Sequence, residues 1–487
     1  MKFSVLSSSV LISSIIASHV VNAATYQVTE IEPLDYRQHI GVAISDNGTI
    51  IGSARDKFSP AFYTEDYLST LTYSNYSCDV SDEELETAVF DAYSTSCIKA
   101  ALINTYSSGS GFQKFNDSKA FKVTADQAEL EILVDEVDSV LGDYTHSNTE
   151  SLKAINEDSL SVGFAGAPYL PVDFQQTGDD ASEELIRFWL QDYQVRAILN
   201  IDGEIRTIIP EVSTYGGIST ANDISNSGYV VGVTSTAILD AAQEAIDENC
   251  DGLLIPVEAC VWALNNSSNI YQTRPVIWQI DNSGDVLSTT LLDLAFEPSE
   301  DHTANYSATP TAVNDSGIAV GYGHIPRSND YIVTQPLIFD ENGTSTFVDV
   351  DDYTSGYAVD INNSGVVVGT MQTFFDNTNN YEFFIYDTTT GEFEFPTTFY
   401  TTAESYAHAI NDEGLVVGEA EYEVTTNTVR RKHGFVYNSI TEEFFDIHDL
   451  VSCDIPYEIV SLNSINNSNQ ILATALKLVD RKDSLGE

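Results

Sequence analysis

Basic residues are scarce in this chain of 487 residues. It contains 20 Lys and Arg against 74 Asp and Glu, which gives a formal net charge of −54 at pH 7. A field of this sign repels phosphate backbones and anionic lipid surfaces, so it disfavours nucleic acid and membrane surfaces as partners. Hydrophobic residues still make up 43% of the chain. We therefore expect a folded protein whose acidic surface suits salty surroundings.

Familiar catalytic motifs and long apolar runs are also lacking. The chain has no G-x-S-x-G elbow, H-E-x-x-H motif, phosphate loop or dinucleotide fingerprint. A carboxylate pair for glycoside hydrolysis cannot be singled out among so many acids. Beyond the N-terminal segment, no stretch is long and apolar enough to cross a bilayer, so we expect a mature form without a membrane span. The absence of these motifs leaves enzyme activity uncertain and favours a protein that is not an enzyme.

The N-terminal segment resembles an export signal. Met1-Lys2 precedes an apolar, Ser-rich stretch, which ends in the small-x-small pattern Val21-Asn22-Ala23. This pattern predicts a signal peptide over residues 1–23 and a mature chain that begins near Ala24. The protein would then be exported, either to the periplasm or outside the cell. A buried N-terminal strand or a helical anchor is the alternative.

The five cysteines fit an oxidising compartment. The simplest connectivity pairs neighbours, Cys78 with Cys97 and Cys250 with Cys260. Cys453 is left over, as a free thiol or an intermolecular partner. Zinc binding is the weaker interpretation, because no CxxC or Cys/His spacing is present.

One short phrase recurs along the chain. It has an apolar residue, an Asn- or Asp-containing turn that closes on Gly, a β-branched run and a second Gly, as in Ile361-Asn-Asn-Ser-Gly-Val-Val-Val-Gly369. Such a turn joins the two strands of a β-hairpin. We expect the second glycines to crowd a narrow centre, because Gly inside a strand marks close backbone approach. The apolar residue that begins each copy lies at Ile44, Ile155, Ile224, Val313, Ile361, Ile410 and Ile465.

Each phrase precedes a short aromatic strand, such as Phe383-Phe-Ile-Tyr386, and a further short strand. The clean copies at Val313, Ile361 and Ile410 follow one another at spacings of 48 and 49 residues. Four strands in a unit of this size predict an all-β fold, a β-propeller of about seven four-stranded antiparallel blades. The segment Tyr26–Ile31 and the C-terminal strand would share the blade that closes the ring. An open β-solenoid is the alternative.

Longer spacings in the first half indicate insertions. We expect a single repeat-built domain over residues 24–480, followed by a C-terminal tail at 481–487. A helical insertion is predicted at about 74–118, where Ser81-Asp-Glu-Glu84 forms a capping box. A disulfide-clipped insertion is predicted at about 236–268.

The repeated phrase and its aromatic strand resemble the bacterial HAF-type extracellular repeats. With its signal peptide, acidic body and paired cysteines, the chain is similar to an uncharacterised family of secreted proteins from aquatic bacteria. The resemblance covers roughly residues 26–478. It implies an exported β-repeat protein and brings no catalytic residues with it. Members often end in a Gly-rich, hydrophobic sorting tail, which this chain lacks.

One motif predicts calcium binding. Asp247, Asn249 and Asp251, with Glu258 further on, match the pattern D-x-[DN]-x-[DN]-G-x5-E, which supplies oxygen ligands to a hard cation. Pro256 inside the loop and a disulfide between Cys250 and Cys260 would hinder the wrapping of the loop around an ion. A metal-free acidic loop clipped by this disulfide is the alternative.

We therefore expect an exported, monomeric binding or scaffold protein whose partner is a glycan, a protein or a matrix. The alternative is a propeller-type polysaccharide hydrolase or lyase that uses carboxylates near the central channel. Convergent acids with an Arg or Tyr in one deep pocket would favour the enzyme.

Overall fold

The structure is a computed structural model of the chain. The residues that it describes are 7–14, 26–31, 38–55, 78, 80–87, 89–104, 118–124, 127–129, 147, 149–177, 185–201, 203–250, 254–267, 269–297, 306–340, 342–375, 378–424 and 430–478.

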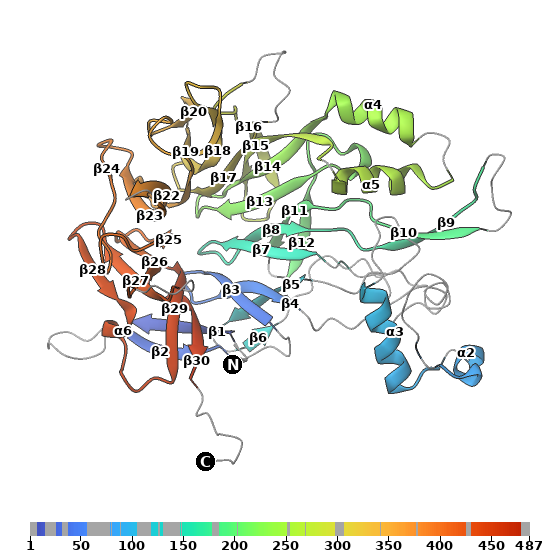
Figure 1. Ribbon diagram of the computed structural model, residues 1–487, viewed down its shortest axis with the longest axis horizontal. Helices are drawn as coiled ribbons and strands as arrows, with labels where there is room; N and C mark the ends of the chain where they lie inside the picture. The colour runs from blue at the N-terminus through green and yellow to red at the C-terminus, as the bar shows by residue number, and fades with distance from the viewer. Residues whose placement is uncertain are drawn as a thin grey trace.

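These residues form seven four-stranded antiparallel sheets arranged as a β-propeller, which confirms the predicted architecture over the open solenoid (Figure 1). Six sheets are each built from one stretch of chain and are called blades 1 to 6. Blade 1 contains β3 (Gln38–Ile44), β4 (Ile50–Arg55), β5 (Ser118–Thr124) and β6 (Gln127–Glu129). Blade 2 contains β7 (Glu150–Ile155), β8 (Ser161–Ala165), β11 (Arg196–Ile201) and β12 (Glu204–Ile208). Blade 3 contains β13 (Ser219–Ile224), β14 (Tyr229–Ile238), β15 (Tyr271–Ile280) and β16 (Val286–Leu291).

The second half of the chain follows the same plan without large insertions. Blade 4 contains β17 (Ala308–Val313), β18 (Ala319–Pro326), β19 (Ile332–Asp340) and β20 (Gly343–Thr346). Blade 5 contains β21 (Gly356–Ile361), β22 (Val366–Phe375), β23 (Thr378–Asp387) and β24 (Phe393–Glu394). Blade 6 contains β25 (Ser405–Ile410), β26 (Leu415–Glu421), β27 (Lys432–Asn438) and β28 (Glu443–Asp446). The short helix α6 (Ile447–Leu450) follows it.

The seventh sheet, called the closing blade, joins the two ends of the chain, as predicted. Its order is β29 (Tyr457–Ile465), β30 (Ile471–Lys477), β1 (Ser7–Ser14) and β2 (Tyr26–Glu30). β1 lies inside residues 1–23, which the sequence predicts to be a signal peptide. The structure places the backbone of residues 7–14 in a sheet, whereas export and cleavage stay predictions.

The repeated turns adopt the predicted backbone. In blade 5 the Gly365 N–H donates to the Asn362 carbonyl oxygen at 3.0 Å, and Gly365 has a φ of +84°. The two copies without Gly keep the left-handed conformation, with φ of 62° at Ser159 and 58° at Asn469. The turn geometry thus persists where the glycine has been lost.

The second glycine of each phrase does not line the channel, so that expectation is wrong in its location. Gly369 lies on the second strand of its blade, opposite a bulge between Ala358 and Asp360 of the inner strand. A Cβ at Gly369 would lie 2.2 Å from the carbonyl oxygen of Tyr357. The close backbone approach is real, but it occurs within the blade.

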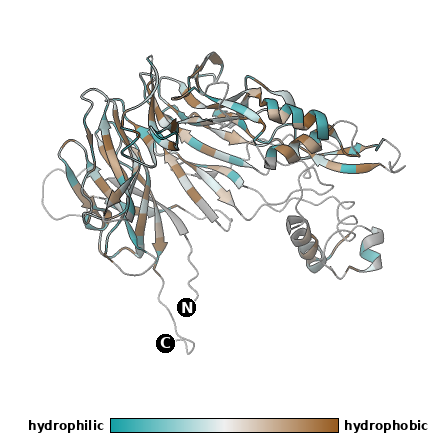
Figure 2. Ribbon diagram, turned by 45° about the horizontal axis from the view of Figure 1, so that its top comes forward, coloured by the Kyte–Doolittle hydropathy of each residue, from teal (hydrophilic) through white to brown (hydrophobic). Residues whose placement is uncertain are grey.

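The core lies between neighbouring blades. One cluster joins Val368 and Phe383 of blade 5 to Ala407 and Phe435 of blade 6, with the two phenyl centroids 4.9 Å apart. Figure 2 shows hydrophobic and hydrophilic residues interleaved along the blade strands. The apolar side chains thus fill the inter-blade layers that hold the ring together.

Helices lie in two of the long connections between second and third strands. The first holds α2 (Asp82–Thr87) and α3 (Ala92–Asn104), and the capping box is present, because the Glu84 N–H donates to Ser81 Oγ and the Ser81 N–H to Glu84 Oε2. The second holds α4 (Asp240–Asn249) and α5 (Val257–Ser267). The hairpin of β9 (Leu170–Phe174) and β10 (Ile186–Leu190) was not predicted. Among the described residues, no helix has the length and apolarity needed to span a membrane.

Candidate functional site

The two faces of the propeller are unlike each other. The repeated turns join the first and second strands of each blade, so they share one face, which we call the turn face. In these antiparallel sheets the connections between second and third strands lie at the opposite end, which we call the insertion face. Figure 1 shows α4, α5 and the β9–β10 hairpin gathered on one side of the ring.

A cavity of about 270 Å³ opens at the turn-face end of the central channel. One residue from each repeated turn forms a ring around it, which we call the turn ring. Its members are Asp46, Glu157, Asn226, Asp315, Asn363, Asp412 and Asn467.

Hydrogen bonds run around the turn ring from sheet to sheet. The Asp315 N–H donates to Asn363 Oδ1 at 2.8 Å, and the Asn363 N–H donates to Asp412 Oδ1 at 2.8 Å. The same bond closes the ring from the Asn467 N–H to Asp46 Oδ1 at 2.7 Å. The ring side chains thus satisfy backbone donors of the preceding sheet.

Carboxylates and amides alternate around the turn ring, with one exception. Asn363 Nδ2 donates to Asp315 Oδ2 on one side and to Asp412 Oδ2 on the other. Asp46 and Glu157, however, are both acids and adjoin each other. A side-chain hydrogen bond to Asp46, with burial and the Asp46 charge, raises the pKa of Glu157.

The buried Asn that opens most turns has a structural role. Asn362 Oδ1 accepts from the Val366 N–H at 2.9 Å, and Asn362 Nδ2 donates to the Asn411 carbonyl oxygen at 3.1 Å. Asn411 repeats the pattern toward Asn466. The repeated Asn therefore ties each sheet to the next.

Two further carboxyl groups of the channel also tie blades together. Asp223 Oδ2 accepts from the Val313 N–H at 2.7 Å, and Asp360 Oδ2 accepts from the Ile410 N–H at 2.8 Å. Burial raises the pKa of Asp223 to about 6, and burial with the Asp223 charge raises that of Asp360 to about 7. Among the described residues that line this cavity, Lys153 is the sole Lys or Arg and no Tyr is present. Acids and His408 therefore converge in this cavity, but its described lining does not combine them with an Arg or a Tyr.

A second cavity, of about 380 Å³, lies on the insertion face and is called the insertion pocket. It is formed by the β9–β10 hairpin, the loop after β10, the 3-10 helix η2 (Thr214–Gly216) and one face of α5. Its volume falls within the usual range for small-molecule sites, roughly 300–1,000 Å³. Its lining comprises Leu170, Val172, Leu190, Gln191, Asp192, Tyr193, Gln194, Tyr215, Gly216, Glu258, Val261, Trp262, Asn265, Ile270 and Tyr271.

The loop at η2 contains an exposed tyrosine whose backbone has an uncommon conformation. Tyr215 has a φ of 55° and is 41% exposed, and Gly216 and Gly217 also have positive φ. The buried Tyr271 fixes this loop, because its hydroxyl accepts from the Gly217 N–H and lies 2.8 Å from the Tyr215 carbonyl oxygen. Strained residues that are held in this way concentrate at binding and catalytic sites.

Amide side chains join the hairpin to α5. Gln191 Nε2 donates to the Ala167 carbonyl oxygen at 2.6 Å, and Trp262 Nε1 donates to Gln191 Oε1 at 3.4 Å. Asn265 Nδ2 donates to Gln194 Oε1 at 2.7 Å. Within the described part of the chain, Gln194 Nε2 is buried and has no hydrogen-bond partner. The pocket therefore combines fixed amides with one unused donor.

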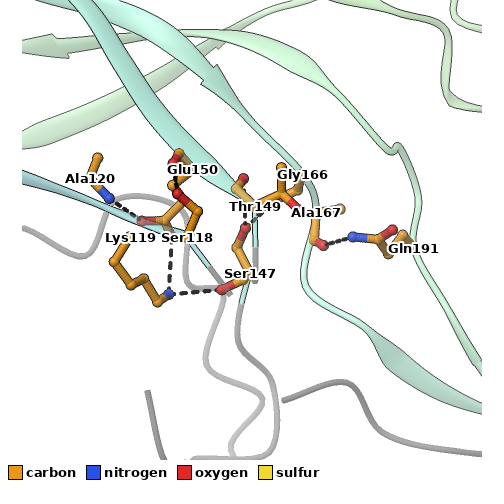
Figure 3. Close-up of polar contacts among 9 residues, drawn as sticks. All are labelled: Ser118, Lys119, Ala120, Ser147, Thr149, Glu150, Gly166, Ala167 and Gln191. Atoms are coloured by element: carbon orange, nitrogen blue, oxygen red, sulfur yellow. Dashed lines mark hydrogen bonds and ion pairs between the residues drawn. The ribbon is translucent and has the colours of Figure 1, made fainter. Parts of the chain in front are cut away.

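A buried ion pair supports the base of the hairpin (Figure 3). Lys119 of blade 1 donates from Nζ to Glu150 Oε1 of blade 2 at 3.1 Å, and neither side chain is exposed. Lys119 Nζ also donates to the Ser147 carbonyl oxygen, and Ser147 Oγ donates to the Gly166 carbonyl oxygen at 2.7 Å. Figure 3 shows this network reaching Gln191 through the neighbouring segment Gly166-Ala167.

Three of the four predicted calcium residues, Asp247, Asn249 and Glu258, lie in α4 and α5. Asp247 and Asn249 belong to the last turn of α4, where Asp247 Oδ1 accepts from Gln243 and Asn249 Nδ2 donates to the Ala245 carbonyl oxygen. Glu258 lies in the first turn of α5 and lines the insertion pocket. Asp251 lies outside the described residues, so the calcium site stays a prediction.

Both predicted disulfides are present. Cys78 pairs with Cys97, and Cys250 pairs with Cys260 across the α4–α5 connection. Cys453 is a free, exposed thiol.

A cluster of His433, Asp446 and His448 has ligand-type atoms close together in the described residues. Both ring nitrogens of His448 are occupied, since Nδ1 lies 3.0 Å from Asp446 Oδ1 and Nε2 accepts from the Ile459 N–H. Burial acts to raise the pKa of Asp446, but the hydrogen bonds from His433 and His448 outweigh it and hold that pKa well below its usual range. The cluster therefore anchors α6 rather than offering free ligands.

Sequence reasoning missed the insertion pocket. Glu258, Val261, Trp262 and Asn265 recur at helical spacing on one face of α5, and the Gly216-Gly217 pair marks the unusual loop. Neither signal shows which distant segments would complete the site.

Three solved structures are similar to this chain at low sequence identity. A puromycin hydrolase is 11% identical, with 90% of this chain and 50% of that chain covered and a TM-score of 0.42, so this chain spans about half its length. The β-propeller domain of the Trilobed protease from Pyrococcus furiosus is 10% identical, with 86% of this chain and 98% of that chain covered and a TM-score of 0.34. An oligogalacturonate lyase from Vibrio parahaemolyticus is 10% identical, with 62% of this chain and 75% of that chain covered and a TM-score of 0.30.

A comparison with curated proteins finds no match. A family model matches the whole chain, residues 1–487. The resemblance to HAF-type repeats and to secreted proteins of aquatic bacteria stays a prediction beside it. The chain belongs to the family described as "Protein of unknown function (DUF3466)".

Proposed function

We propose that this protein is an exported binding protein that holds a neutral carbohydrate in the insertion pocket. The observation that carries the proposal is the pocket itself, which is lined by the exposed Tyr215. The backbone of Tyr215 is held in the left-handed conformation. Apolar lining with a few placed polar groups is the usual composition of a ligand site.

The chemistry of the lining suits sugars. A pyranose has C–H faces that pack against aromatic rings, and here Tyr193, Tyr215 and Trp262 supply such rings. Its hydroxyl groups need partners that both donate and accept, which the amides of Gln191, Gln194 and Asn265 provide. A sugar hydroxyl would also give the unused donor of Gln194 an acceptor.

Charge selects the kind of sugar. Asp192 and Glu258 line the pocket, and no Lys or Arg does so among the described residues. With a net charge of −54, the protein repels uronates and sulfated chains and tolerates neutral or amino sugars. This charge pattern disfavours a lyase that acts on uronate polymers.

The N-terminal sequence and the disulfides support a role outside the cytoplasm. The sequence of residues 1–23 resembles a signal peptide, and two disulfides are compatible with an oxidising compartment.

Titration calorimetry with a panel of neutral oligosaccharides (cello-, xylo-, malto- and chito-oligomers) tests the proposal. We expect one of them to bind at micromolar to millimolar concentration, and Tyr215→Ala to weaken that binding at least tenfold. Tyr331→Ala is the matched control, because Tyr331 is 65% exposed and lies outside the pocket. Heat with none of the oligosaccharides, or equal loss in both variants, would overturn the proposal.

Hydrolysis is the second candidate function, because Asp192 and Glu258 are two carboxylates that line one pocket. Release of reducing ends from the bound oligosaccharide, lost in both Asp192→Asn and Glu258→Gln, would make the protein a glycosidase. Binding without such release would make it a binding protein only.

We also propose that calcium binds between α4 and α5, where Asp247, Asn249, Asp251 and Glu258 match a calcium-loop pattern that begins in the last turn of α4 and ends in the first turn of α5. Calorimetric titration with calcium should give heat that the double variant Asp251→Ala/Glu258→Ala loses. No heat with the unmodified protein would leave a metal-free loop clipped by its disulfide.

A further inference from the structure

The closing blade contains a strand that export would remove. β1 (Ser7–Ser14) is the third strand of this sheet, and it pairs antiparallel with β30 from Ser7 opposite Leu476 to Ile12 opposite Ile471. Its other edge pairs with β2, from Val10 opposite Glu30 to Ser14 opposite Tyr26. All of β1 lies within residues 1–23.

The strands on either side of β1 have anchors of their own. Tyr26 of β2 is 7% exposed and belongs to the core cluster that contains Ile459, Ile471 and Ala473. Val28 packs against the same cluster. β2 therefore keeps apolar contacts with the closing blade that do not depend on β1.

Polar contacts hold the other end of β2. Glu30 Oε2 accepts from the Tyr457 hydroxyl at 2.6 Å and from Lys477 Nζ at 2.9 Å. Tyr457 begins β29 and Lys477 ends β30, so these bonds reach past the position of β1. They fix β2 two strand spacings from β30, a gap of about 10 Å.

We infer that removal of the leader opens a slot one strand wide between β30 and β2, and that this slot binds an extended apolar segment of a partner protein. The inference rests on the export part of the proposed function and is independent of the sugar pocket. Both walls of the slot would carry unpaired backbone groups, so an inserted strand gains hydrogen bonds along two edges.

The chemistry of the occupant follows from the walls. The wall residues Ala473 and Ala475 of β30 are small and buried, which leaves room for larger apolar side chains opposite them. Glu30 and the net charge of −54 disfavour an acidic segment. A neutral or basic strand with a short apolar run between small hydroxyl residues, as in the Ser-Ser-Ser-Val-Leu-Ile-Ser-Ser sequence of β1, fits best.

The test uses the processed protein, purified after export of the full chain. The probe is a labelled peptide with the sequence of residues 7–14 and a solubilising Lys tag, and its binding is followed by fluorescence anisotropy. The control peptide carries Leu11→Pro, which removes a backbone donor in the middle of the strand. We expect binding of the first peptide and at least tenfold weaker binding of the second.

Amide hydrogen exchange of β30 supplies the second readout. Its amides should exchange quickly in the processed protein and slowly once the peptide is bound. Slow exchange without peptide, together with no binding, would mean that β2 has moved into the slot and would overturn the inference. Fast exchange with no binding would overturn the docking role, and an exported protein that retains residues 1–23 by mass spectrometry would overturn the opening itself.

Discussion

The turn face and the insertion face of this propeller are built in different ways. On the turn face, the same short phrase places a buried Asn and a ring side chain in nearly every sheet, and their hydrogen bonds run between neighbours. On the insertion face, segments that occur once fold over blades 2 and 3 and enclose a pocket. The repeated face therefore supplies cohesion, and the irregular face supplies the site that can distinguish one ligand from another.

The strongest test of this comparison removes one tie on the turn face. Asn411 is 4% exposed and bonds to Leu415 within its own turn and to Asn466 in the next sheet. We expect Asn411→Ala to lower the free energy of unfolding by about 3 kcal/mol, because buried backbone groups lose their partners. Urea denaturation measures the change.

Asn411→Ser is the matched control for that tie. Two turns already carry Ser at this position, and Ser225 Oγ accepts from the Tyr229 N–H. The Ser variant should therefore lose only the bond to the next sheet. Its free energy of unfolding should lie between those of the unmodified protein and of Asn411→Ala. A loss below about 1 kcal/mol in the Ala variant would mean that apolar packing alone holds the ring.

On the insertion face, opening a disulfide should have a local effect. Cys250 and Cys260 are ten residues apart, so Cys250→Ser/Cys260→Ser should cost about 2 kcal/mol of local stability in the α4–α5 segment. We expect faster amide exchange in α4 and α5 and an unchanged thermal midpoint for the blades. A large drop in that midpoint would show that the two faces unfold as one unit.

The buried carboxyl groups of the channel make a pH-dependent contribution. The pKa of Asp360 is raised to about 7 in the folded protein, against about 3.9 when unfolded. Its stabilising contribution is thus fully present below about pH 4 and is lost as the pH rises through 7. We expect Asp360→Asn to reduce the fall in unfolding free energy between pH 5 and pH 8 by about 1–2 kcal/mol.

Urea titrations at the two pH values measure that difference, with Asp173→Asn as the control, since Asp173 pairs with Arg187 at the surface. An Asp360→Asn profile parallel to that of the unmodified protein would mean that the carboxyl group is solvated in the channel.

Tyr215 should show opposite effects on stability and on binding. Gly adopts a φ of 55° without strain, so Tyr215→Gly should raise the free energy of unfolding by up to about 1 kcal/mol. The same variant should lose oligosaccharide binding, because it removes the exposed ring. Calorimetric melting and titration on one sample measure both, and reduced stability would mean that the ring packs structurally.

The smallest effect concerns the acid pair of the turn ring. Glu157→Gln supplies an amide donor to Asp46 at every pH, whereas the carboxyl group must be protonated to donate. Because Glu157 is exposed, we expect a rise of only about 1 °C in melting temperature at pH 8 and none at pH 4. A fall at pH 8 would mean that the two acids do not share a proton.

The turn face could be predicted from the sequence because its signals are local. Asn362 and Gly365 lie within one turn, and the same four-residue pattern recurs at each inner strand. The role of the buried Asn in joining sheets could not be predicted, since its partner lies 49 residues away. Spacing alone does not show which face of a turn meets its neighbour.

The insertion pocket could not be predicted for a related reason. Leu170, Tyr215 and Trp262 come from three segments that share no repeat, and only the folded ring brings them together. The β9–β10 hairpin was missed because it lies inside what the repeat pattern treats as one blade. An N-terminal strand was predicted only as the alternative to a signal peptide, because an apolar, Ser-rich segment fits both.

The number of members in the turn ring has a consequence of its own. Two kinds of group can alternate perfectly around an even ring, but in a ring of seven one pair of like neighbours is unavoidable. Here that mismatch falls between Asp46 and Glu157, at the seam between blades 1 and 2, and the same seam carries the buried pair of Lys119 and Glu150. An odd number of members thus makes the contact between blades 1 and 2 chemically different from the other contacts between blades. This difference breaks the rotational symmetry of an otherwise repetitive ring.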